Sequence, residues 1–135
     1  MSNYSTLIFK RRSNETEISR YTIIINDPHS ETFAKEAALN KLIQFGVFEH
    51  VKEIVKDIWK PMVIREKALE GLTRNPAGNE EFLLSIINDM YSLYTFRKMA
   101  LEGVIRSKSK RHLLEIINGI DTPEWARTQA SKALQ

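Results

Sequence analysis

The chain has 135 residues, of which 42% are hydrophobic and 27% charged. This length fits one ordinary domain with one core, and the composition excludes a disordered, collagen-like or membrane-spanning chain. The absence of cysteine excludes disulfides, thiolate catalysis and thiolate metal sites. A net charge of +3 permits contact with a polyanion without requiring it. The first residues show no signal pattern, so we expect a cytoplasmic protein with no membrane partner.

Residues 1–27 are predicted to form a β-hairpin. Two runs rich in β-branched and aromatic residues, Tyr4–Arg11 and Glu17–Asn26, flank the polar turn Ser13-Asn14-Glu15. Both runs contain consecutive apolar residues, which predicts that both faces of the hairpin are covered. Because a two-stranded hairpin is only marginally stable alone, we expect one face to pack on the helices that follow. The other face would meet a partner or a second copy of the chain, giving a homo-oligomer through the hairpin.

Residues 28–135 have the hydrophobic spacing of helices, and cap and stop residues divide them into seven short ones. Pro61 and Pro123 fit the first turn of a helix, where a missing N–H is tolerated. Gly46 and the loop 75–78 end helices. The chain is therefore predicted to be one mainly α domain with a β appendage. The predicted helices are 30–45, 47–59, 61–74, 79–91, 92–106, 109–119 and 122–135.

An internal repeat is the most specific signal in the sequence. The segment 65–72, which contains Arg65 and Gly71, returns as 97–104 with Arg97 and Gly103, and the four residues Ala-Leu-Glu-Gly keep their order. Lys35 precedes this arginine position by one period, and Arg127 follows it. A period of 30 to 32 residues made of two helices is typical of an α-solenoid. We predict three full units and a terminal half-unit.

Two repeat positions suggest how the units pack. Gly71 and Gly103 lie within predicted helices, where glycine costs about 1 kcal/mol relative to alanine. We expect a close approach of the preceding unit to compensate. Ala133 occupies this position in the last unit and Lys41 in the first.

At these residues the chain resembles the HEAT-like repeat family, in particular the short repeats of phycobilin lyases. The first helix of such a unit starts with a Pro-acid-apolar-Arg pattern, which Pro123, Glu124 and Arg127 match; Arg65 and Arg97 match the arginine alone. The resemblance covers residues 30–135 and implies a right-handed solenoid in which the repeated arginines tie units together. It does not fix a function, because such repeats serve as scaffolds, adaptors, lyases and nucleic-acid binders.

Two basic clusters are candidate contacts for an anion or an acidic partner. One lies at the expected hairpin tip, and the other lies in the loop before helix 109–119, where a helix N-terminus also favours anions. A solvated surface is the commoner role of such clusters. The residues are Lys10, Arg11 and Arg12 in the first cluster, and Arg106, Lys108, Lys110 and Arg111 in the second, which His112 extends.

No catalytic residue, metal site or cofactor is predicted. The three histidines, His29, His50 and His112, are scattered singly without metal-ligand spacing or a triad-like neighbourhood. No glycine-rich phosphate loop is present.

The sequence therefore favours a non-enzymatic adaptor that binds another protein. The alternative is a nucleic-acid-binding protein that uses residues 10–12 and 106–112. A third hypothesis, implied by the resemblance, is a bilin lyase or a chaperone-like factor for a tetrapyrrole protein.

Overall fold

The computed structural model describes the backbone of residues 2–135 and the side chains from Asn14 onward. The described chain is mainly α and contains no strand. None of its helices has the length and apolarity that crossing a membrane demands. The helices are α1 (Ser2–Asn26), α2 (Thr32–Gln44), α3 (Phe48–Lys56), α4 (Met62–Arg74), α5 (Glu80–Ile87), α6 (Tyr94–Ser107), α7 (Lys110–Asn118) and α8 (Glu124–Leu134).

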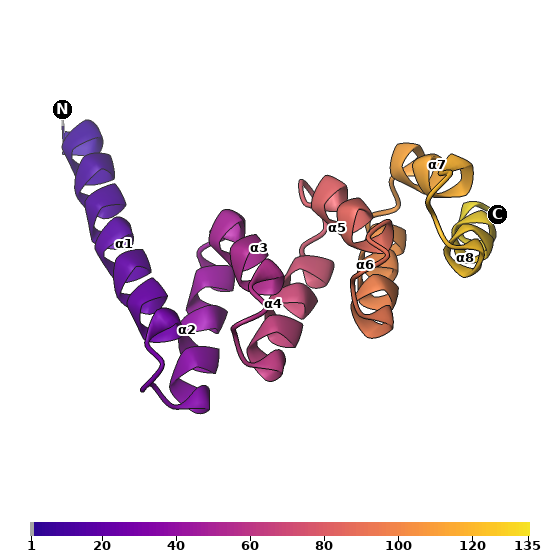
Figure 1. The fold of residues 1–135 in the computed structure, drawn as a ribbon. Coiled ribbons are helices and arrows are strands. Elements are labelled where there is room, and N and C mark those ends of the chain that lie inside the picture. The colour runs from indigo at the N-terminus through magenta and orange to yellow at the C-terminus, as the bar shows by residue number, and fades with distance from the viewer. Residues whose placement is uncertain (1) are drawn as a thin grey trace.

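The helices stand in a row of pairs and do not gather around one centre (Figure 1). The closest partners are α1 with α2, α3 with α4, α5 with α6 and α7 with α8. The second helices of the pairs also pack on one another in chain order, α2 on α4, α4 on α6 and α6 on α8. The predicted count of three and a half units needs correction, because α1 completes a pair with α2 and α8 pairs with α7.

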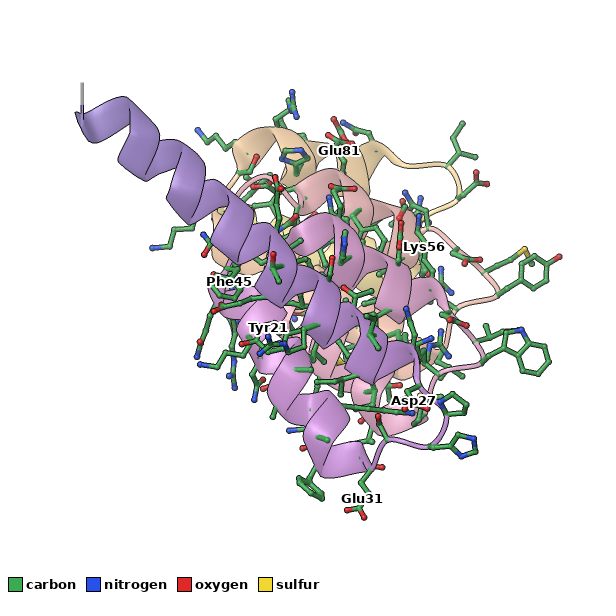
Figure 2. The ribbon with its side chains drawn as sticks, turned by 90° about the vertical axis from the view of Figure 1, so that its left-hand side faces the viewer. Tyr21, Asp27, Glu31, Phe45, Lys56 and Glu81 are labelled. Atoms are coloured by element: carbon green, nitrogen blue, oxygen red, sulfur yellow. The ribbon has the colours of Figure 1, made fainter. Side chains whose placement is uncertain are left out.

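The predicted N-terminal hairpin is wrong, because Ser2–Asn26 forms one helix. Ile18, Tyr21 and Ile25 have the helical spacing i, i+3 and i+7, and this face packs on the array. Ile25 is 1% exposed, and the ring of Tyr21 stacks on that of Phe45 with centroids 6.2 Å apart (Figure 2). Packing against α2 thus overrides the strand preference of the β-branched run. Without a hairpin there is no hairpin edge for self-association.

The core is a continuous apolar layer that runs along the row. Its residues recur with the sequence period: Leu42, Leu72 and Val104 are fully buried at one position of the second helices. Val51 and Leu83 are fully buried at one position of the first helices. Each pair therefore buries its apolar faces against the pairs beside it, as a stacked array requires.

The repeated glycines lie where second helices approach each other closely. A Cβ on Gly71 would lie 2.9 Å from Cγ1 of Ile43 in α2, and one on Gly103 would lie 3.1 Å from Cα of Thr73 in α4. Ile43 and Thr73 are themselves one period apart. Both glycines therefore meet the same position of the preceding second helix.

The repeated arginines also make equivalent contacts. Nε of Arg65 donates to the carbonyl oxygen of Val55 at 2.9 Å, and Nε of Arg97 donates to that of Ile87 at 2.8 Å. The guanidinium of Arg65 also lies over the ring of Phe96 in α6, 5.0 Å from its centroid. Each of the two arginines thus ties the start of a second helix to the end of the helix before it. At the same position, Lys35 is buried and Arg127 is half-buried.

Candidate protein-binding edge

Consecutive turns inside the helix pairs lie side by side along the row. Asn26 and Asp57 line one shared cavity, and Ile58 and Tyr91 line another; a hydrogen bond joins the third turn to the fourth. We call this side of the row the turn edge.

In the first three pairs an aspartate closes the turn: Oδ1 of Asp27, Asp57 and Asp89 accepts a backbone N–H from the residue two positions later, each at 2.9 Å. This is the local bond by which aspartate favours turns over helix. The fourth turn has Gly119 at this position, and the buried Thr122 donates from Oγ1 to Oδ1 of Asn88 at 2.7 Å.

These turns end the first helices earlier than the hydrophobic spacing predicts. The predicted helices 47–59 and 79–91 end at Lys56 and Ile87. The residues after each aspartate therefore lie outside regular structure, on the surface. The donors to Asp57 and Asp89 are Trp59 and Tyr91, and each is 89% exposed.

The turn edge carries most of the exposed large hydrophobic residues of the described chain. Of the thirteen large hydrophobic residues exposed in the described part, ten lie in these turns or in the first turn of the helix that follows. Exposed hydrophobic residues that gather in one region mark an interaction site more often than residues scattered singly do. We call this set the apolar strip; it consists of Phe33, Ile58, Trp59, Met62, Val63, Met90, Tyr91, Leu93, Tyr94 and Ile120.

A groove interrupts the strip between the second and third pairs. It has a volume of about 450 Å³ and opens between the turn after α3 and the turn after α5. Its lining is mostly apolar, with the guanidinium of Arg65 beside the ring of Phe96. The apolar lining includes Ile58, Met62, Phe82, Ile86, Tyr91 and Leu93.

Aromatic side chains continue the strip toward the fourth pair. The rings of Tyr94 in α6 and Trp125 in α8 meet edge to face, with centroids 5.1 Å apart. Both line a smaller groove between these helices, with Lys98 and Glu102 beside them. The ring contact thus joins the apolar strip on the third pair to the fourth pair.

An ion pair lies within the turn that carries Trp59. Nζ of Lys60 lies 3.0 Å from Oδ2 of Asp57. Two hydrogen bonds to its carboxylate lower the pKa of Asp57 below its usual value. The bond from Lys60 has the larger effect, and the bond from the backbone N–H of Trp59 has the smaller. A lowered pKa means that the charged carboxylate stabilises the folded chain above the pKa it has when unfolded, and that this stability is lost as the pH falls through the folded pKa.

Asp57→Asn should therefore lower the free energy of unfolding near pH 7 by less than about 1 kcal/mol, because the pair is partly solvated. Asparagine keeps the oxygen that accepts from Trp59, so the substitution removes mainly the charge. Urea unfolding of both proteins near pH 7 and near pH 3 measures the difference, which should shrink at the lower pH. Lys60→Met is the matched control and should cause a similar loss near pH 7. A difference that persists unchanged at low pH would contradict this account of the turn.

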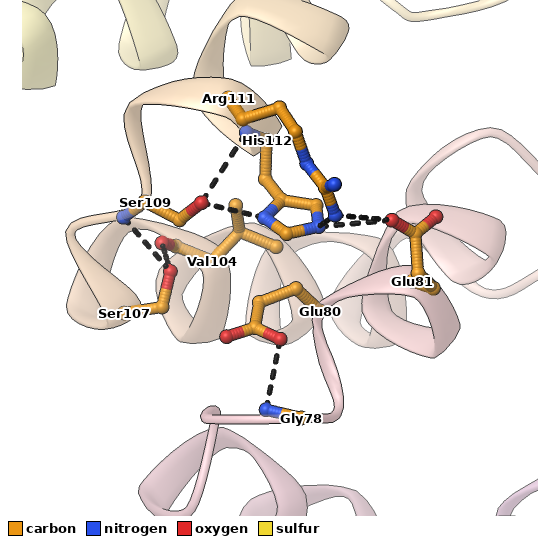
Figure 3. Close-up of polar contacts among 8 residues, drawn as sticks. All are labelled: Gly78, Glu80, Glu81, Val104, Ser107, Ser109, Arg111 and His112. Carbon is orange, nitrogen blue, oxygen red and sulfur yellow. Dashed lines mark hydrogen bonds and ion pairs between the residues drawn. The ribbon is translucent and has the colours of Figure 1, made fainter.

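The structure places the two predicted basic clusters far apart in the chain order of its helices, one in α1 and the other around the start of α7. Lys10, Arg11 and Arg12 lie within α1, and their side chains are outside the described residues. In the second cluster, Nη1 of Arg106 donates to the carbonyl oxygen of Thr73 at 3.2 Å. Nη2 of Arg111 lies 3.2 Å from Oε1 of Glu81 (Figure 3). Arg106 and Arg111 therefore contact the preceding pair.

His112 forms a contact that the sequence did not suggest. Its Nδ1 lies 2.6 Å from Oγ of Ser109, and its Nε2 lies 2.9 Å from Oε1 of Glu81 (Figure 3). This order of groups resembles a catalytic triad. However, Oγ of Ser109 caps α7 by accepting from the backbone N–H of His112, and the histidine is 6% exposed. A nucleophile must instead be free to reach a substrate carbonyl. We therefore assign Ser109, His112 and Glu81 a structural role, in which they hold α7 against α5.

No protein-family model matches this chain, and neither does any curated protein or solved structure. Among the described residues, no group of three or more histidine, aspartate or glutamate side chains is placed to hold a metal ion. The geometry of the chain itself is therefore the basis for assigning a function.

The residues of the turn edge are those that sequence reasoning missed. Within the predicted helix 47–59, the hydrophobic spacing i, i+3, i+4 and i+7 puts Ile58 on the same face as Val51, Ile54 and Val55, which predicts that Ile58 is buried. Tryptophan is usually packed in the interior or at its margin, which predicts the same for Trp59. A signal for the turns was present: Asp27, Asp57 and Asp89 recur with the period of the repeat. Each follows an apolar run and precedes a new helix start.

Proposed function

We propose that this chain is an adaptor built as a HEAT-like α-solenoid, and that it binds another protein through the apolar strip. The observation that carries the proposal is the concentration of ten exposed large hydrophobic residues along one edge, in register with the helix pairs. An exposed tryptophan or tyrosine costs solubility, and a partner that covers it removes that cost.

The composition of the strip fits what protein partners bind. Tryptophan and tyrosine are enriched among residues that contribute most of the binding energy at interfaces, especially where they are next to a pocket. Trp59 and Tyr91 come from consecutive turns, and the groove lies between those turns. Repeat arrays supply extended surfaces of this kind to their partners.

The proposal predicts that Trp59→Ser with Tyr91→Ser weakens partner binding at least about tenfold and leaves the fold intact. Both side chains are almost fully exposed, so their loss removes little from the core. Affinity capture from the native host, with nuclease treatment and mass spectrometry, should recover proteins on the wild type and at least about tenfold less of them on the variant. Each hot-spot residue contributes about 2 kcal/mol or more.

Leu114→Ser is the matched control, because Leu114 is an exposed large hydrophobic residue on α7, away from the strip. It should retain the partners at the wild-type level. Recovery of the same proteins in the same amounts on all three baits would reject the strip as the binding surface. Loss of the bound material on nuclease treatment would favour the nucleic-acid alternative.

A further inference from the structure

The edge opposite the turns carries a third groove, which we call the basic groove. It has a volume of about 410 Å³ and lies where the end of α6, the start of α7 and the end of α8 meet. Its floor is apolar and its lining includes two lysines. The lining residues are Ile105, Lys108, Lys110, Leu113, Ala133 and Leu134.

The charges of the two lysines are not compensated within the described chain. Neither Lys108 nor Lys110 has a hydrogen bond or ion pair from its side chain there, whereas Arg106 and Arg111 are engaged by α4 and α5. No carboxylate occurs between residues 106 and 113, and the nearby Glu81 already contacts Arg111 and His112. The groove therefore combines apolar surface with two free positive charges.

The backbone that carries these lysines is held in place. Lys108 has a left-handed conformation with φ of 58°, which a glycine adopts without strain and a lysine does not. The backbone N–H of Ser109 donates to Oγ of Ser107 at 3.2 Å, and Ser109 caps α7. The contact of His112 with Glu81 anchors the same turn of α7 to α5 (Figure 3). A preorganised connection of this kind reduces the entropy lost when a ligand binds.

We propose that the basic groove binds an acidic amphipathic peptide segment of another protein. Aliphatic side chains of the segment fit between Ile105, Leu113 and Leu134, and its carboxylates pair with Lys108 and Lys110. The apolar floor favours a peptide over a nucleic acid, because phosphates gain nothing from contact with aliphatic side chains and lose water there. This groove is separate from the apolar strip, so the inference stands without the proposed function.

Selection of random peptides of about 12 residues on the full chain provides an unbiased test. The enriched peptides should combine aspartate or glutamate with leucine, isoleucine or phenylalanine. A fluorescent form of the strongest peptide should bind Lys108→Glu with Lys110→Glu at least about tenfold more weakly than the wild type. An acidic residue suits the start of α7, so the variant should keep its fold, which circular dichroism checks.

Three further variants separate the groove from the rest of the surface. Arg20→Glu with Lys41→Glu makes the same charge change at exposed positions outside the basic groove and should leave peptide affinity unchanged. Ala133→Gln places a polar side chain in the groove at an exposed helix position and should weaken the peptide. Trp59→Ser with Tyr91→Ser should bind it as the wild type does, so failure of the proposed function and failure of this inference give different results.

The inference is overturned if selection recovers no peptide, if the enriched peptides are neutral or basic, or if the lysine variant binds them equally well. Single-stranded RNA and vesicles that contain phosphatidylserine are run beside the peptide. Binding of either that depends on Lys108 and Lys110, and that displaces the peptide, would assign the groove to that anion instead.

Discussion

Gly103→Ala should lower the free energy of unfolding by about 2 kcal/mol, whereas Gly71→Ala should change it by less than about 1 kcal/mol. On an exposed helix each change would instead stabilise, because alanine is the better helix former by about 1 kcal/mol. At position 103 the new Cβ would lie 2.9 Å from Cδ1 of Leu83 and 3.1 Å from Cα of Thr73. Thr73 Cα belongs to the backbone of α4, so α4 and α6 must separate to admit the methyl group.

At position 71 the atoms in the way belong to the side chain of Ile43, which is only partly buried. A rotamer change of Ile43 makes room for a methyl group without moving a helix. Urea unfolding followed by circular dichroism measures both variants. Equal effects at the two positions, or a gain at position 103, would contradict the close approach of α4 and α6 and remove the packing basis for the solenoid proposal.

The row of helices was the part of the fold most accessible from the sequence, because short-range rules and the repeat agreed on it. Gly71 and Gly103 indicated a close approach, since only packing offsets glycine inside a helix. The contacts of Arg65 and Arg97 were harder to predict in detail. Their acceptors are the carbonyl oxygens of Val55 and Ile87, and a backbone atom leaves no signature in the sequence.

A hairpin over residues 1–27 leaves the predicted helix 30–45 to begin the first unit, so the three and a half predicted units are one helix out of phase with the pairs of the structure. The β-branched run of this N-terminal segment has high strand propensity, yet propensity yields to packing when a helical face is available. Once Ser2–Asn26 is helical, it pairs with α2, and every later pair shifts by one helix.

The candidate sites were only partly predictable, for two physical reasons. At the turn edge, Asp57 and Asp89 compete with the helix by bonding to the backbone two residues on, and hydrophobic spacing does not register such a bond. In the basic segment, the sequence locates the cations but not their partners, because Arg111 contacts Glu81, thirty residues earlier. That pairing depends on how neighbouring pairs stack, so only a structure separates Lys108 and Lys110 from the engaged arginines.

Ile25→Ala should lower the free energy of unfolding by about 2 to 4 kcal/mol, whereas Ile23→Ala should change it by less than about 0.5 kcal/mol. Ile25 is 1% exposed and belongs to the core cluster, so its truncation leaves a cavity. Ile23 is 68% exposed, and alanine there also improves helix propensity. Urea unfolding of the two variants gives the comparison directly.

This pair of variants separates a helix from a strand at the N-terminus. Residues two apart point to the same face of a strand but to nearly opposite faces of a helix. A hairpin would therefore lose similar stability at positions 23 and 25, because both isoleucines would share one covered face. Similar losses of unfolding free energy at the two positions would favour the hairpin and would make α2 the first helix of the array. A large loss of stability at position 25 alone supports α1 as the first helix of the first pair. It thereby also supports the assignment of the turns at the turn edge as the turns inside the helix pairs.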